Sequence, residues 1–154
     1  MLLSRPVLQP LVALLALCLL PVVQAAPPLQ VSDAWVAEAP PVATVQAGYL
    51  TLENPGPQDI TITGASCPDF DSVEIHEMRM ANGMMEMNQI EKLVVPAGGQ
   101  VQLAPGGFHL MLFKPQRVLK AGDTVTVTLQ LESGASLPVP MPVKKRSAND
   151  THHH

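Results

Sequence analysis

Four side chains with metal-binding chemistry lie at fixed spacing in the middle of the chain. Ten residues separate His76 from Met87, twenty-one separate Met87 from His109, and Leu110 alone separates His109 from Met111. Thioether sulfur is a soft ligand, and imidazole nitrogen binds copper, zinc, iron and nickel, so two of each favour Cu(I). We therefore predict a Cu(I) site formed by His76, Met87, His109 and Met111.

Other kinds of metal site fit these residues less well. Zinc sites usually contain cysteine, or several histidines with a carboxylate. A blue-copper electron-transfer site requires a cysteine thiolate beside two histidines, and no cysteine lies near His109. Cys67 is the only cysteine after residue 25, and its place before Pro68 favours a small buried side chain. No nucleophile elbow, phosphate loop or pair of catalytic carboxylates occurs, so we expect a binding protein and not an enzyme.

Further methionines surround the proposed ligands: Met78, Met80, Met84 and Met85. Methionine in a β domain commonly fills the core, so a purely structural role is the alternative for the whole set. Side chains alternate between the two faces of a strand, which places Met85 on the same face as Met87. The residue pattern therefore leaves open which of these two methionines holds the ion, and whether the others contact it or pack around it.

Short β-strands must position these side chains. Sixteen prolines, ten glycines and many valines and threonines favour strands and turns, and no sustained helical period is free of proline and glycine. We expect an all-β domain, an antiparallel β-sandwich or Greek-key barrel. The proline-rich segment 136–144 is predicted as an edge strand, because proline cannot donate to a ladder. The predicted strands lie within 29–39, 47–54, 59–65, 71–80, 84–90, 93–99, 100–107, 108–113, 123–133 and 136–144.

Strand alternation predicts which side chains face the core. In segment 108–113 it places Leu110 and Leu112 on one face, and His109 and Met111 on the other. In the same way Val73 and Ile75 would point inward and His76 outward. The sequence Asn82-Gly83 is a strong hairpin signal, and a turn there would bring Met87 back alongside the strand of His76. Gly106-Gly107 would allow a tight turn into the strand of His109.

The two ends of the chain predict export and a polar tail. Residues 1–25 form an apolar signal peptide with cleavage expected after Ala25, and no later stretch is long and apolar enough to span a membrane. A lipoprotein role for Cys18 is less favoured, because Leu17 precedes it where a small residue is expected. We expect a periplasmic domain over 26–143 and a disordered tail over 144–154. Its last residues, His152, His153 and His154, either bind Cu(II) or are the remnant of a purification tag.

The net charge also bears on partners. At −4, with dispersed lysines and arginines apart from Lys144-Lys145-Arg146, the chain lacks the basic face that nucleic-acid binding requires. We expect no nucleic-acid partner and no membrane insertion after signal cleavage.

The four-residue spacing resembles the signature of the PCuAC family of periplasmic copper chaperones. The similarity covers about 29–143 and includes SDAWV, AGYLTLEN, VEIHEM, NGMMEM and VVPAGGQVQLAPGGFHLML. The resemblance implies a cupredoxin-like fold, Cu(I) ligation by the four residues, and delivery toward cytochrome c oxidase assembly. Its implied partners are a Sco-type copper protein or cytochrome oxidase subunit II, and the alternative is a copper-buffering or resistance protein without a client. An arginine often follows the tryptophan in this family, whereas Val36-Ala37-Glu38 follows Trp35 here.

Overall fold

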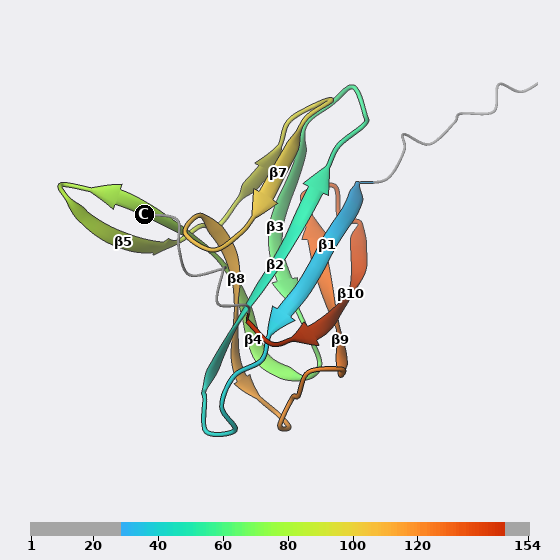
Figure 1. Cartoon of the computed structure of the whole chain (residues 1–154). Helices are drawn as coiled ribbons and strands as arrows, with labels where there is room; N and C mark the ends of the chain where they lie inside the picture. Colours follow the sequence, from blue (N-terminus) through green and yellow to red (C-terminus); the bar gives the residue numbers. More distant parts are fainter. Residues whose placement is uncertain (1–28, 147–154) are drawn as a thin grey trace, which may run out of the picture.

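A computed structural model describes residues 29–146, and all regular secondary structure in this range is β-strand (Figure 1). The ten predicted strands are all present, so the all-β prediction is confirmed. Their bounds are β1 Gln30–Ala37, β2 Val45–Glu53, β3 Ile60–Ser66, β4 Phe70–Ala81, β5 Met84–Gln89, β6 Leu93–Val95, β7 Gln100–Leu103, β8 Phe108–Pro115, β9 Thr124–Leu131 and β10 Ser136–Lys144. The predicted signal peptide, Cys18 and the three terminal histidines lie outside the described residues.

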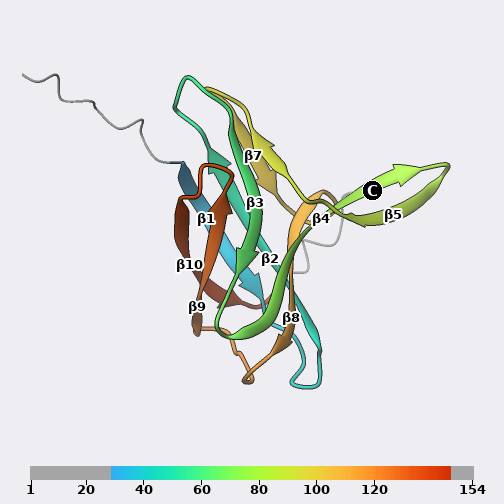
Figure 2. The ribbon, with the colours of Figure 1, turned by 180° about the vertical axis from the view of Figure 1, so that it is seen from behind.

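The strands close into a barrel (Figures 1 and 2). They follow the order β5-β4-β8-β7-β2-β1-β10-β9-β3-β6, and a further pairing of β3 with β4 joins the two halves. The pairings are antiparallel except for β1 with β10 and β7 with β8. β2 pairs with β8 through its first half and with β7 through its second half. This closure leaves β5 and β6 outside the ring, each at one end of the order.

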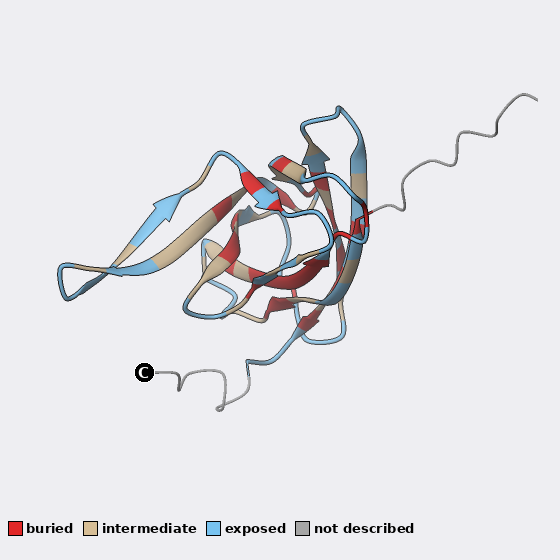
Figure 3. Ribbon diagram, turned by 90° about the horizontal axis from the view of Figure 1, so that it is seen from above, coloured by how far each residue is buried: buried red, intermediate tan, exposed pale blue. Residues whose placement is uncertain are grey.

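Aliphatic side chains from every strand of the ring form the core. Figure 3 marks the buried residues in red along the strands of the barrel. Leu110 and Leu112 of β8 are fully buried, and Val73 and Ile75 of β4 are buried beside them. The predicted inward faces of both strands are therefore confirmed. Cys67 also belongs to this core, as its position before Pro68 suggests.

The prediction that segment 136–144 forms an edge strand is wrong. β10 lies between β1 and β9 and pairs with β9 from Ser136 to Pro142. The backbone of Val143 bonds toward β9: its N–H donates to Asp123, and its carbonyl accepts from Gly122. Successive residues of a strand bond to opposite neighbours, so the positions occupied by the alternating prolines face β1, where the donor that proline lacks is not needed. Accordingly, β1 pairs with β10 only through Val36–Val143 and Ala37–Lys144. Proline is accommodated here because one side of an interior strand is largely unpaired.

The hairpin formed by β4 and β5 projects away from the barrel (Figures 1 and 3). Its turn residues Asn82 and Gly83 have φ angles of 50° and 78°. Both values are positive, as a type I′ turn requires, so the predicted hairpin is confirmed.

Within residues 29–146 there is no helix long and apolar enough to cross a membrane.

Candidate metal centre

The two predicted histidine ligands lie directly opposite each other on neighbouring strands. In the antiparallel register of β4 and β8, His76 pairs with His109 and Glu74 pairs with Met111. Paired residues of an antiparallel ladder project on the same face. Because Ile75 and Leu110 occupy the core face, His76, His109 and Met111 share the outer face, as strand alternation predicts.

The hairpin adds methionine to this outer face. Met87 of β5 pairs with Met78 of β4, two residues beyond His76. Met78, Met87, His109 and Met111 line one pocket of about 380 Å³. The pocket wall is completed by residues from β2, the turn before β8 and the end of the described chain, namely Val45, Gln46, Ala47, Tyr49, Pro105, Gly106 and Arg146.

The imidazole of His109 is fixed in this pocket. His109 as a residue is only 6% exposed, and its Nδ1 lies 3.0 Å from the carbonyl oxygen of Gly107. The same carbonyl accepts a 3.0 Å hydrogen bond from the backbone N–H of Met78. The preceding Gly106 has a φ of 85°, a left-handed conformation that glycine adopts readily. When Nδ1 donates to Gly107, the lone pair of His109 lies on Nε2, the nitrogen that remains for a metal.

The imidazole of His76 is held differently. Its Nε2 lies 2.8 Å from Oε2 of Glu74, two residues earlier on the same strand face. Its Nδ1 is buried and has no hydrogen-bond partner among the described residues. The His76 ring centre lies 6.0 Å from that of His109 and 6.5 Å from that of Phe113. When Nε2 donates to the carboxylate, Nδ1 carries the lone pair, which is the carboxylate–histidine arrangement found behind many metal ligands.

The structure thus groups three of the four predicted ligands more closely than the fourth. Met87, His109 and Met111 line the pocket, whereas His76 faces His109 from the neighbouring strand but does not line it. Between the two methionines that the sequence leaves open, Met87 lines the pocket, whereas Met85 lies two residue pairs further toward the hairpin tip and does not line it. The donor set fits a soft ion: two thioethers together with two imidazoles, each of which has one nitrogen without a hydrogen bond from residues 29–146.

Three residues of the site were missed from the sequence. Glu74 is the hydrogen-bond partner of His76, and strand alternation could have found it because the two residues share a face. Tyr49 lines the pocket from β2, and its ring lies against that of Trp35 at a centroid distance of 4.9 Å and an angle of 42°. Arg146 also lines the pocket, and nothing in the local pattern of the chain end points to that position.

Harder ligands do not gather elsewhere on the barrel. Between residues 29 and 146, no group of three or more histidine, cysteine, aspartate or glutamate side chains is placed to hold a metal ion. Burial raises the pKa of the Cys67 thiol above its ordinary value, which disfavours the thiolate that metals bind. Cys67 is therefore described as a residue of the hydrophobic core.

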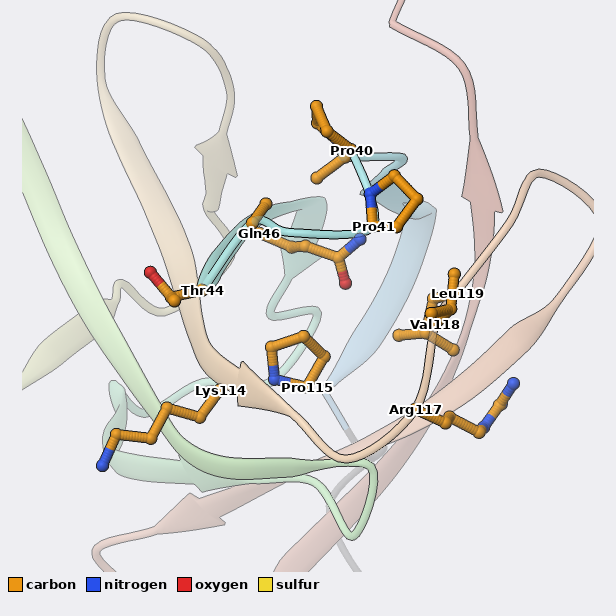
Figure 4. A pocket seen from close by; sticks show the side chains of 11 residues that line it. Pro40, Pro41, Thr44, Gln46, Lys114, Pro115, Arg117, Val118 and Leu119 are labelled. Atoms are coloured by element: carbon orange, nitrogen blue, oxygen red, sulfur yellow. The ribbon is translucent and has the colours of Figure 1, made fainter.

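A second hollow adjoins the site but carries different chemistry (Figure 4). Its walls are mostly proline and aliphatic, with the Gln46 amide turned into it, and its volume is about 360 Å³. The two cations at its edge are already paired, Lys114 with Asp71 and Arg117 with Asp69. No methionine, cysteine or histidine is among the residues that line this hollow, so it does not resemble the predicted Cu(I) site.

Comparison with known proteins identifies relatives of the whole described domain. The family described as "Putative lipoprotein LpqE-like" matches residues 29–143. "Putative lipoprotein Lxx21020" from Leifsonia xyli subsp. xyli is 36% identical over 126 residues, which cover 80% of this chain and 75% of that protein.

Solved structures agree on the fold. The solution structure of CuI-DR1885 from Deinococcus radiodurans has a TM-score of 0.66 and 37% identity, covering 79% of this chain and 81% of that chain. The copper-bound PCuAC domain from PmoF2 has a TM-score of 0.66 and 20% identity, covering 80% of this chain and 97% of that chain. The predicted cupredoxin-like fold and the predicted resemblance to PCuAC proteins are therefore confirmed.

Proposed function

Because the chain belongs to the LpqE-like family and has the fold of PCuAC domains, we propose that it binds Cu(I) and passes it to a partner protein. The observation that carries the proposal is the pocket in which Met87, His109 and Met111 converge, with His76 opposite His109. The Cu(I)-bound form of a 37% identical relative supports the same cargo here.

The chemistry of the site favours transfer over catalysis. Neutral thioethers and imidazoles suit Cu(I), and thioethers are not consumed by disulfide formation as thiolates are. Met87 is 48% exposed, so one ligand can be reached by another protein while His109 stays fixed inside the pocket. An ion held partly by an exposed, flexible side chain can be exchanged without opening the barrel.

We place this activity in the cell envelope, in the periplasm. The relatives named as lipoproteins support an exported protein. Export by cleavage after Ala25 and anchoring through Cys18 give different mature N-termini, so the mass of the purified mature chain distinguishes them. A chain that keeps residues 1–25 and remains in the cytoplasm would contradict the placement.

Competition with a Cu(I) chelator tests the binding site. The intact protein should take one Cu(I) with high affinity, and His109→Ala and Met111→Leu should each weaken it strongly. X-ray absorption should show a monovalent ion with both sulfur and nitrogen ligands. Unchanged affinity in a His109→Ala/Met111→Leu double variant would exclude this site.

The client is tested in cells. We propose delivery toward cytochrome c oxidase assembly, to a Sco-type protein or to oxidase subunit II. A deletion strain should then lose oxidase activity and regain it with added copper. Copper sensitivity with intact oxidase would instead favour a buffering protein without a client.

A further inference from the structure

The hairpin carries methionines that neither the core nor the pocket explains. Met80 and Met84 are each 66% exposed, and Met85 is 51% exposed. None of the three belongs to the hydrophobic core of the barrel, and none lines the pocket of the proposed site. Exposed methionines on a projecting hairpin therefore do not stabilise the fold by burial.

The hairpin register arranges some of these side chains as pairs. Met78 lies opposite Met87, and Met80 lies opposite Met85. The N–H of Met78 donates to Gly107, away from β5, so Met78 and Met87 form a pair of the non-hydrogen-bonded kind. The Met80–Met85 pair, two residues further along both strands, has the same character. In such pairs the Cα atoms are only about 4.5 Å apart, and the side chains lie close together.

The two pairs lie in line with the proposed site. Residues two apart on a strand share a face and lie about 6.6 Å apart, so Met80 follows Met78 on the face that carries His76. Met84 differs: it pairs with Ala81 and projects on the opposite face. From the hairpin tip inward, the outer face thus presents one thioether pair, then a second, and then the imidazoles.

We propose that Met80 and Met85 form a second, exposed Cu(I) site that loads the pocket from the hairpin tip. This inference rests on the proposed function. Two neighbouring thioethers can bind a soft monovalent ion. They are neutral and carry no ionisable proton, so this binding releases no proton. Lacking imidazole, this pair should hold the ion more weakly than the pocket, which is what a loading step requires. Ligand exchange along the face then moves the ion to Met78 and Met87 and onward to His109 and Met111.

Silver(I), a redox-stable ion of the same charge and softness, tests the proposal in the mature full-length protein. The methionine methyl groups are labelled with ¹³C, assigned by single Met→Leu variants, and followed by NMR during titration. The first equivalent should shift the methyl signals of Met87 and Met111. Further silver should then shift Met80 and Met85 together, before Met84, which is equally exposed and serves as the internal control.

Matched variants complete the test. Met80→Leu/Met85→Leu should lose the second set of shifts and take up Cu(I) from a chelator more slowly, with unchanged affinity of the pocket. Met84→Leu should change neither the shifts nor the rate. If Met87 and Met111 respond while Met80 and Met85 move no earlier than Met84, the loading site is wrong and the proposed function stands. If no methionine signal responds, both proposals are wrong.

Discussion

Substituting the adjacent residues Leu110 and Met111 separates stability from copper binding. Leu110 is fully buried in the barrel core, whereas Met111 lines the pocket on the outer face. Leu110→Ala should cost about 2–5 kcal/mol, because it removes buried methyl groups and leaves a cavity. Met111→Leu nearly conserves volume and should cost less than about 1.5 kcal/mol.

Thermal unfolding without metal measures the first half of this prediction. For a domain of this size, 1 kcal/mol corresponds to about 4 °C in Tm. Leu110→Ala should therefore lower Tm by about 10–20 °C, and Met111→Leu by less than about 6 °C. If Leu110→Ala does not fold, Ile75→Val provides a milder core change of about 0.5–1.5 kcal/mol on the neighbouring strand.

Thermal unfolding with Cu(I) measures the second half. An ion that binds only the folded state adds about 4 kcal/mol of stability when its free concentration is 1,000-fold above Kd. With free Cu(I) set by a chelator, the intact protein and the core variant should both gain about 16 °C in Tm. Met111→Leu should lose most of this gain, because the stabilisation falls with the logarithm of the weakened affinity.

The reverse pattern would refute the reasoning. If Met111→Leu kept the full Cu(I)-induced rise in Tm, Met111 would not be a ligand. If Met111→Leu destabilised the metal-free protein as much as Leu110→Ala does, the assignment of the two residues to opposite faces would be wrong.

Three further predictions follow from single contacts in the structure. Glu74→Ala removes the partner of His76 and should weaken Cu(I) binding about 10- to 100-fold in chelator competition, whereas Glu77→Ala on the opposite face should not. An alanine Cβ at Gly48 would lie 3.1 Å from a core side chain, so Gly48→Ala should lower the urea-derived free energy of unfolding by about 1–3 kcal/mol. Burial raises the pKa of Cys67, so above the ordinary thiol pKa of about 8.5 the unfolded chain releases a proton that the folded chain keeps. Stability should therefore fall as pH rises through that range, and Cys67→Ala, compared by urea unfolding from neutral to alkaline pH, should show a smaller fall.

Local patterns in the sequence predicted most of the local structure. Alternation depends only on strand geometry, so it correctly assigned the inward leucines of β8 and the outward His109 and Met111. Asn82-Gly83 predicted the hairpin, because these residues tolerate the positive φ angles of its turn.

Pairings between distant strands could not be predicted in the same way. The proline-rich strand β10 lies inside the sheet because β1 approaches only its end, a fact of tertiary packing that no local pattern encodes. Likewise, His76 faces His109 without lining the pocket, which depends on how β4, β5 and β8 pack and not on strand alternation. In both cases the local sequence is compatible with more than one packing of the strands, and tertiary contacts determine which one forms.

The outer face of β4 and β8 can differ in chemistry from the core because neighbouring side chains on each strand point to opposite faces. β4, β5 and β8 bring thioethers and imidazoles together by register, and the same backbone places Ile75 and Leu110 in the interior. The Gly107 carbonyl, which accepts hydrogen bonds from both the Met78 backbone and the His109 ring, fixes the hairpin against the pocket. In the proposed function, the rigid imidazole of His109 at the barrel serves to hold the ion, and the exposed methionines of the hairpin serve to exchange it with a partner.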